Sequence, residues 1–344
     1  QAAAVARGMR LVPLVLTVGV ADLQSCRKHI AEVNLYDDVT NPERLGVYLD
    51  CVQLLRHQDE DQAPKDIHIT GQHFPTLLTT YHREPAVVPD ALRQGEPEAP
   101  HFFVTPALDL NIGHVMKLVG THNPHQSYQM QQLLRPGDAV IDAGGNLGGY
   151  TLPFASRVGL DGVVVAFEPF RHTFQALTAN VALNGLLNVY TVHAALGDHD
   201  SRILLNQPSM RTFNTLAAMR VQGGPDPESG ANMGIFYDGQ EEVEVKTLDG
   251  YLEAFPRVLG DRPLRLIKVD VEGMEVEVAK GAAATIRRHL PIVWAENVAY
   301  FESDGKDVAF LRAMLEVGYE CSKVDTAPQD LLCTERHGAG HQPD

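Results

Sequence analysis

The sequence predicts an α/β fold with a doubly wound, mostly parallel β-sheet that ends in an antiparallel C-terminal strand. From about residue 108, short apolar segments alternate with segments of helical periodicity. The apolar segments are continuous, which is typical of parallel strands that helices cover on both faces. A glycine-rich loop follows the first of them, at the usual position of a ligand-binding turn in such sheets. The composition of the 344 residues, 44% hydrophobic and 21% charged, is that of a globular protein.

The elements follow in a regular order. A helix is predicted over residues 126–134, and a turn at residues 136–138 leads into the first strand. Predicted strands cover residues 139–142, 162–167, 189–195, 264–270 and 291–295, and predicted helices extend to about residue 158 and over 170–184 and 274–288. Segments near 318–320 and 331–334 are predicted to form the closing antiparallel pair. Residues 206–241 are rich in proline and glycine, which indicates a lid or binding loop, with disorder as the alternative.

The N-terminal part of the chain is predicted to be a separate region, less certainly α/β, over residues 1–107. Its last part, 84–106, carries five prolines and reads as an extended strap. The main domain is expected over residues 108–338, with a tail at 339–344. Residues 7–20 place two arginines before an apolar run, as in a signal peptide or anchor. We favour a buried strand there over membrane contact, and Gln1 in first position suggests a trimmed chain.

Charge and cysteine usage restrict the classes of partner and compartment. The formal charge of −16 opposes the phosphates of nucleic acid, so DNA and RNA are not expected partners. No stretch approaches the ~20 apolar residues of a membrane-spanning helix. Cys26, Cys51, Cys321 and Cys333 form no metal-binding spacing. We expect reduced thiols and a cytoplasmic protein. Disulfides 26–51 and 321–333 are the alternative if the protein is organellar, luminal, secreted or membrane-anchored; the oligomeric state is not predicted.

Two acidic strand ends indicate the cofactor. The glycine loop, residues 140–150, reads V-I-D-A-G-G-N-L-G-G-Y. Asn146 stands where a dinucleotide fingerprint requires its second glycine, which argues against NAD. Asp142 at the strand tip suits a ligand with an ammonium group and no phosphate, and Glu168 at the next tip can accept both hydroxyls of a ribose. Together these features predict S-adenosylmethionine, against the alternative of a plain tight turn and a surface acid.

Further strings extend this prediction to a family. They are P-G-D-A-V-I-D-A-G-G-N-L-G-G-Y-T (136–151), F-E-P (167–169), N-V-A-L-N-G-L (180–186), A-A-L-G-D (194–198), V-K-T-L-D (245–249) and L-I-K-V-D-V-E-G-M-E (266–275). In this order they resemble the FkbM-type methyltransferases over about residues 108–338. The resemblance implies a class I, Rossmann-like fold and S-adenosylmethionine-dependent O-methylation. It implies that Asp142, Gly144, Asn146 and Gly148 bind the methionine end of the cofactor. It also implies that Glu168 binds the ribose and that Ala195 and Leu196 lie near the adenine.

The acids of the later strands are the catalytic candidates. Lys268 and Asp270 alternate onto one face of the fourth strand, and Glu272 falls in the following turn. Since an alcohol needs a base to become a good nucleophile, we expect Asp270 and Glu272 to serve as base, joined by Glu296 after the fifth strand. Acids at a helix start also occur for capping alone. No separate metal site is predicted, but three carboxylates can also bind Mg²⁺ or Ca²⁺.

The sequence therefore predicts an enzyme, an S-adenosylmethionine-dependent O-methyltransferase. The expected partner is a small-molecule or glycan acceptor with a hydroxyl group: a sugar, a glycolipid or a polyketide-like product. The alternatives are a nicotinamide-dependent oxidoreductase on a similar sheet and a non-catalytic assembly module with this fold. Residues 1–107 are expected to pack against the main domain and help to select the acceptor, with an anchor or oligomerisation element as the alternative.

Overall fold

The computed structural model describes residues 67–70, 75–80, 102–106, 109, 112–113, 116, 123–209, 237–297, 300–301, 303, 305–306 and 308–336. Contacts between Cα atoms divide the chain into two compact units, Gln1–Ala63 and Pro64–Asp344. All described residues belong to the second unit. The strand or anchor expected over 7–20, Cys26, Cys51, most of the strap and the tail lie outside the described residues.

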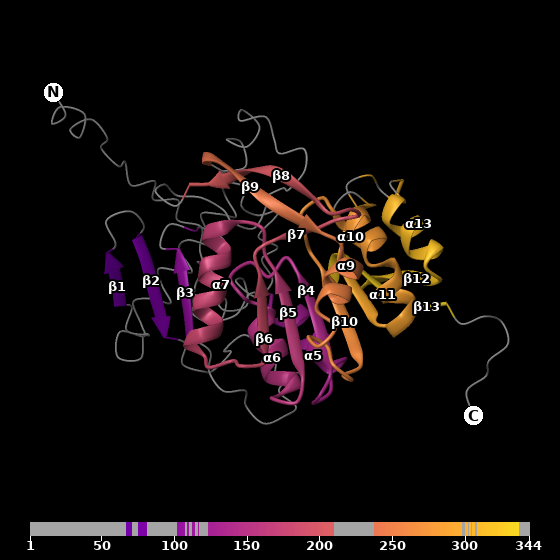
Figure 1. The fold of residues 1–344 in the computed structure, drawn as a ribbon, viewed down its shortest axis with the longest axis horizontal. Coiled ribbons are helices and arrows are strands. Elements are labelled where there is room, and N and C mark those ends of the chain that lie inside the picture. The colour runs from indigo at the N-terminus through magenta and orange to yellow at the C-terminus, as the bar shows by residue number, and fades with distance from the viewer. Residues whose placement is uncertain are drawn as a thin grey trace, which may run out of the picture. The chain divides into compact units, whose positions relative to one another are not determined.

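A seven-stranded sheet in the order β12-β13-β11-β10-β4-β5-β6 forms the centre of the second unit (Figure 1). Strands β4 to β6, β10 and β11 are mutually parallel, and β13 is antiparallel to both of its neighbours. The doubly wound, mostly parallel sheet with an antiparallel C-terminal strand is therefore confirmed. Its strands are β4 (Ala139–Ala143), β5 (Val163–Phe167), β6 (Val189–Val192), β10 (Leu264–Val269), β11 (Ile292–Glu296), β12 (Tyr319–Val324) and β13 (Ala327–Glu335).

Helices connect these strands as the apolar pattern predicts. Every residue of β4 and β5 is buried, because the sheet is covered on both faces. The helix predicted over 274–288 is instead two helices, α10 and α11, which meet at Ala282. The described helices are α5 (Pro124–Gln132), α6 (Thr151–Val158), α7 (Arg171–Leu183), α9 (Leu248–Ala254), α10 (Glu275–Gly281), α11 (Ala283–His289) and α13 (Ala309–Glu316).

A second small sheet, in the order β7-β9-β8, was not predicted from the sequence. The strand expected over 189–195 ends at Val192, and β7 (Ala195–Leu196) pairs with β9 instead. The expected loop over 206–241 contains the ends of two long antiparallel strands, β8 (Ser201–Pro208) and β9 (Tyr237–Lys246). Residues 210–236 between them lie outside the described residues. The alternating charges of β9, E-E-V-E-V-K, are the signal of a half-exposed strand.

A third sheet contains β1 (Ile67–Thr70), β2 (Pro75–Thr80) and β3 (Phe102–Pro106), all antiparallel. The end of the expected strap is thus a strand. Asn180 of α7 joins it to the glycine loop: its Nδ2 donates to Val104 O at 3.2 Å and to Leu147 O at 2.8 Å, and its Oδ1 accepts from Val104 N at 2.5 Å. The division of the chain at residue 107 stays a prediction.

The expectation of reduced thiols is wrong for two of the cysteines. Cys321 and Cys333 lie opposite each other on β12 and β13 and form a disulfide. Direct cross-strand opposition brings the two side chains within reach of each other, which sequence spacing alone does not reveal. Among the described residues, no helix has the length and apolar character needed to cross a bilayer.

Candidate active site

The glycine loop after β4 requires backbone conformations that favour glycine. Gly144 and Gly148 have φ angles of +85° and +94°, in a region that other side chains rarely adopt. A Cβ atom on Gly144 would lie 1.8 Å from the backbone oxygen of Asp270. Asn146 has a positive φ of 46°, which asparagine tolerates better than most residues. The loop therefore passes directly beside the end of β10, where the catalytic candidates begin.

Glu168, at the end of β5, is enclosed beside this loop. Its Oε2 accepts a hydrogen bond from the amide of Asn146 at 2.9 Å, and its Oε1 accepts one from the amide of Phe170 at 3.0 Å. Burial raises the pKa of Glu168 to about 7, although both hydrogen bonds and the charge of Lys268 act in the opposite direction. The side chain is 3% exposed. The role of Glu168 in holding a ribose stays a prediction. A ribose hydroxyl would have to donate to a carboxylate lone pair that the two backbone amides do not use.

Asp142 and Lys268 form a buried ion pair between β4 and β10. Lys268 Nζ lies 3.1 Å from Asp142 Oδ1 and 3.3 Å from Asp270 Oδ2, and it donates to Gly144 O at 2.7 Å. Asp142 Oδ2 accepts a hydrogen bond from Thr151 Oγ1 at 2.6 Å. Burial lowers the pKa of Lys268, but the charges of Asp142 and Asp270 raise it by more, so the net pKa is above its usual value. The lysine is therefore a fixed positive charge between the two aspartates.

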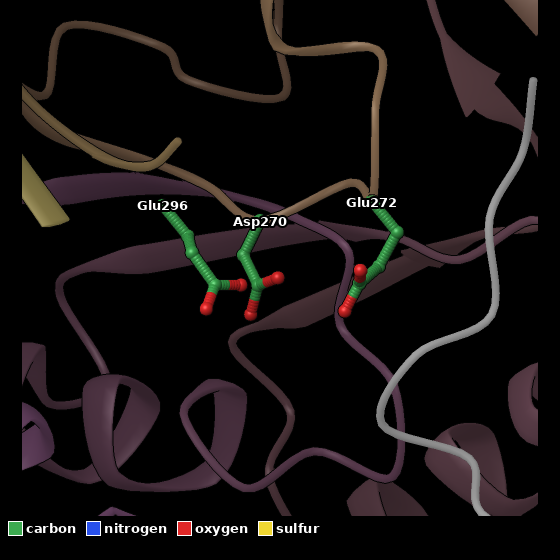
Figure 2. A group of neighbouring side chains, drawn as sticks. All are labelled: Asp270, Glu272 and Glu296. Atoms are coloured by element: carbon green, nitrogen blue, oxygen red, sulfur yellow. The ribbon is translucent and has the colours of Figure 1, made fainter. Parts of the chain in front are cut away.

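The three predicted catalytic acids lie together at the neighbouring strand ends. Asp270 follows β10, Glu272 lies two residues further on in the same turn, and Glu296 ends β11. Each offers a carboxylate oxygen, and these oxygens lie within 4.8 Å of one another. Figure 2 shows the three side chains pointing to the same side of the backbone. Because β10 and β11 are parallel neighbours, their carboxyl ends meet at one edge of the sheet.

Glu296 and Asp270 have unequal environments. Burial raises the pKa of Glu296 well above its usual value, and the charges of Asp270 and Glu272 and a hydrogen bond to Asp270 raise it further. The raised pKa favours the protonated form of Glu296, in which its carboxyl group can donate a hydrogen bond to Asp270. Asp270 also faces the Lys268 ammonium, which stabilises its negative charge. Two carboxyl groups in such different surroundings can act as acid and base.

Asp330 on β13 is a fourth acid at this edge, which sequence reasoning missed. It pairs in register with Glu296, and its side chain is 4% exposed. Its Oδ2 accepts hydrogen bonds from Trp294 Nε1 at 2.5 Å and from Gln126 Nε2 at 3.1 Å. Burial raises its pKa to about 7, the Trp294 hydrogen bond and Lys268 lower it, and Asp270 raises it. In the sequence, Asp330 is a single acid next to the apolar residues of a predicted strand. Because it belongs to no motif, it looks the same as an exposed surface acid.

The two residues predicted near adenine lie in the small sheet. Ala195 and Leu196 form β7, are buried, and pair with Val245 and Lys246 of β9. Ala195 packs against Val245 and Met274. The position of β7 therefore depends on its pairing with β9 and on its packing against Met274 before α10. The role of Ala195 and Leu196 in binding adenine stays a prediction.

The acid cluster also has the ligand types of a hard-cation site. Carboxylate oxygens are preferred by Mg²⁺ and Ca²⁺, and Asp270, Glu272 and Glu296 can each supply one. The raised pKa of Glu296 opposes cation binding there, because a carboxylate must be ionised to act as a ligand. Lys268, 3.3 Å from Asp270 Oδ2, already supplies positive charge to the cluster. The three acids are thus equally compatible with two arrangements: a base and an acid that act without a metal ion, and a site that binds a cation.

The sheet order, the glycine loop and the acidic strand ends define a class I methyltransferase with a Rossmann-like fold. The chain belongs to the methyltransferase FkbM domain family, whose model matches residues 142–321. The match includes the glycine loop from Asp142 onward, Glu168, the acid cluster up to Glu296, and β12 as far as Cys321. It ends before Asp330. The resemblance predicted from the sequence is therefore confirmed, and the chain is a methyltransferase.

Two curated relatives, and solved structures such as the one below, are similar to the chain. Methyltransferase 1 of Beauveria bassiana (strain ARSEF 2860) is 29% identical over 205 residues, which is 57% of this chain and 79% of the relative. Methyltransferase sdnD of Sordaria araneosa is 30% identical over 158 residues, 41% of this chain but only 59% of the relative. The crystal structure of the FkbM methyltransferase of Methylobacillus flagellatus KT has 14% identity and a TM-score of 0.36, and the match covers 65% of this chain and 54% of that one. That structural likeness is too weak to support an argument about function.

Proposed function

We propose that the protein transfers a methyl group from S-adenosylmethionine to a hydroxyl group of a small-molecule or glycan acceptor, namely a sugar, a glycolipid or a polyketide-like product. The observation that carries the proposal is the Asp270–Glu296 pair beside the glycine loop. Membership in a methyltransferase family does not favour a nicotinamide oxidoreductase. A non-catalytic module is also disfavoured, because such a module has no need for a buried lysine balanced between two aspartates.

The charges of the site suit this cofactor. Lys268 interacts with Asp142, Asp270 and Asp330, and Glu272 and Glu296 lie beside Asp270, so acids outnumber bases in the site. S-adenosylmethionine supplies an activated methyl group on a positively charged sulfonium, and its methionine end carries an ammonium group. An acidic site in a low-dielectric environment attracts such a cationic ligand and repels the phosphates of a dinucleotide.

Asp270 is the residue best placed to accept a proton from an acceptor hydroxyl. It lies next to the loop that would hold the cofactor, since its amide donates to Ala143 O at 3.0 Å. Lys268 stabilises the ionised form of Asp270 before the reaction. The hydrogen bond between Glu296 and Asp270 helps to orient the Asp270 carboxylate as a proton acceptor. An amine acceptor, already a good nucleophile when neutral, has less need of this arrangement.

The N-terminal region is the part of the chain that we propose selects the acceptor. Its strand β3 contacts α7 and, through Asn180, the glycine loop. A chain starting near Ala107 lacks β3, so it would lose this support of the loop as well as any acceptor contact. A truncation before Ile67 keeps β1 to β3 and therefore tests acceptor selection more cleanly.

We propose an oxidising compartment for the protein in place of the cytoplasm expected from the sequence. Disulfides persist in oxidising environments and are rare in the cytosol. The Cys321–Cys333 disulfide therefore supports a luminal, organellar or secreted location over a cytoplasmic one.

Methyl transfer with S-adenosylmethionine labelled in its methyl group tests the proposed reaction. The protein is incubated with a panel of hydroxylated sugars, glycolipids and polyketide-like compounds, with amines as controls, and the product methyl is located by NMR. We expect an O-methyl product, and transfer that persists in EDTA would favour Asp270 acting as a base without an ion. Transfer only to nitrogen would overturn the O-directed assignment, and loss of transfer with EDTA, restored by Mg²⁺ or Ca²⁺, would assign the acid cluster to a metal.

A further inference from the structure

We infer that Asp330 is a positioning residue that connects the cofactor loop to the catalytic acids through Gln126 and Tyr150. The inference rests on the proposed function, because it assumes that the glycine loop binds S-adenosylmethionine. The site residues predicted from the sequence all lie on or just after β4, β5, β7, β10 and β11. The inference adds residues from three other elements, α5, the start of α6 and β13.

A continuous set of hydrogen bonds joins these elements. Tyr150, the last residue of the glycine loop, donates from its hydroxyl to Gln126 Oε1 at 2.8 Å. Gln126 Nε2 donates to Asp330 Oδ2 at 3.1 Å, across 204 residues of sequence. The same oxygen accepts the Trp294 indole N–H at 2.5 Å. Each amide atom of Gln126 thus has a defined partner, which fixes the orientation of that side chain.

Both ends of this set of bonds lie against the reacting groups. At one end, the ring of Tyr150 lies 5.1 Å from Lys268 Nζ, measured to the ring centre. Lys268 in turn contacts Gly144 O and Asp270. At the other end, Asp330 and Trp294 lie on β13 and β11, beside Glu296. The hydrogen bonds thus extend from the glycine loop at Tyr150 to Asp330, which pairs in strand register with Glu296.

A purely structural role accounts poorly for Asp330. Its carboxyl is buried close to the acids Glu296 and Asp270, and the positive charge that faces it is that of Lys268, which Asp142 and Asp270 also share. The other polar neighbours of Asp330 are Tyr150, Trp294 and Gln126. Burial of a carboxylate that shares one lysine with two other aspartates costs stability rather than adding to it. An acid at this position is therefore better explained by the orientation of the site than by stability.

A double-mutant cycle tests the connection in the full-length chain. Asp330→Asn and Gln126→Leu are made singly and together, and the affinity for S-adenosylmethionine is measured by calorimetry. If the residues act as a unit, each single variant and the double variant lose the same affinity, about fivefold, whereas independent residues would lose about 25-fold in the double variant. Asp325→Asn and Gln132→Leu are matched controls, since both side chains are exposed, and they should bind as the wild type does.

A spectroscopic measurement separates positioning from stability. Trp294 is the only tryptophan of the chain, so its fluorescence reports the Asp330 contact without a label. We expect S-adenosylmethionine to change this emission in the wild type, and to change it much less in Gln126→Leu, which leaves Trp294 and Asp330 intact. If Asp330→Asn does not fold, Tyr150→Phe removes only the hydroxyl at the other end and replaces it in the cycle.

Three results would be decisive against the inference. Wild-type affinity in Asp330→Asn and Tyr150→Phe, full additivity in the cycle, or an unchanged emission response in Gln126→Leu would each overturn the inference and leave the proposed function standing. Failure of the wild-type chain to bind S-adenosylmethionine would overturn the proposed function, and the inference with it.

Discussion

The two halves of the site treat their carboxylates in opposite ways. At the ends of β4 and β5, each acid is satisfied inside the protein: Asp142 by Lys268 and Thr151, and Glu168 by two backbone amides. At the ends of β10 and β11 and near the start of β13, Asp270, Glu296 and Asp330 lie close together around part of one lysine charge, and only Asp330 also accepts hydrogen bonds from Trp294 and Gln126. The first half is suited to holding a ligand in a fixed position, and the second to exchanging a proton with one. Substitutions that break each half should therefore have different effects.

The largest expected effect is on turnover, in the acid half. Asp270→Asn removes the proton acceptor while keeping the shape of the side chain, so methyl transfer should fall by about 10²- to 10⁴-fold. The affinity for S-adenosylmethionine should change far less. Single-turnover transfer of labelled methyl, beside calorimetry on the same preparation, measures both. A variant that retains the wild-type rate would exclude Asp270 as the base.

The next effect is on stability, where the two halves meet. Lys268→Met leaves Asp142 buried without its ion-pair partner and should lower the free energy of unfolding by about 3–5 kcal/mol. Equilibrium unfolding in urea, followed by circular dichroism, gives this value. Lys280→Met is the matched control, because Lys280 is exposed on α10. Equal stability of the two variants would show that the Lys268 charge does not hold the halves together.

A smaller effect is expected on cofactor binding in the first half. Glu168→Gln should weaken the affinity for S-adenosylmethionine by about 1.5–3 kcal/mol, because hydrogen bonds from the ribose to a charged acceptor become neutral ones. The two backbone amides can still donate to the glutamine oxygen, but only to that one atom. Glu253→Gln on the exposed face of α9 controls for the loss of surface charge. Undiminished affinity would remove Glu168 from the cofactor site.

The smallest effect is a pH dependence shared by both halves. Burial raises the pKa of Glu168 and of Asp330 to about 7. Below that pH both acids take up protons, so the site becomes less negative and the affinity for the cationic cofactor should fall between about pH 8 and 6. For stability the sign is opposite. A raised folded-state pKa favours the protonated folded form. This contribution to stability is fully present below the unfolded pKa values, 4.5 for Glu168 and 3.8 for Asp330, and is lost as the pH rises through about 7.

Calorimetry across this pH range, with Glu168→Gln alongside the wild type, separates the contributions. The variant should keep the part of the pH dependence that comes from the acid half. An affinity that rises as the pH falls would contradict the proposed charge complementarity.

The first half of the site could be predicted from the sequence, and the second only in part. The glycine loop, Asp142 and Glu168 are close in sequence and stand at strand ends that the apolar pattern fixes. Asp270, Glu272 and Glu296 were predicted for the same reason. Asp330 and Gln126 could not be, because their meeting depends on how β13 and α5 pack, and neither lies in a motif.

The misread regions have a similar explanation. The strands β8 and β9 carry the alternating pattern of half-exposed strands, but the proline- and glycine-rich residues between them dominated the interpretation. The strand after α7 ends at Val192 rather than Ala195, because Ala195 pairs with β9 in another sheet. The Cys321–Cys333 disulfide depends on the register of β12 and β13, which composition does not fix.

Calorimetric titration of the full-length chain with S-adenosylmethionine, and separately with NAD⁺, tests the central claim that an acidic glycine-loop site binds a cationic, phosphate-free cofactor. The account predicts saturable binding of S-adenosylmethionine with one site per chain and no detectable heat from NAD⁺ at the same concentrations. Weaker binding of S-adenosylhomocysteine, which lacks the sulfonium charge, is the matching expectation. Binding of NAD⁺ without binding of S-adenosylmethionine would contradict the account.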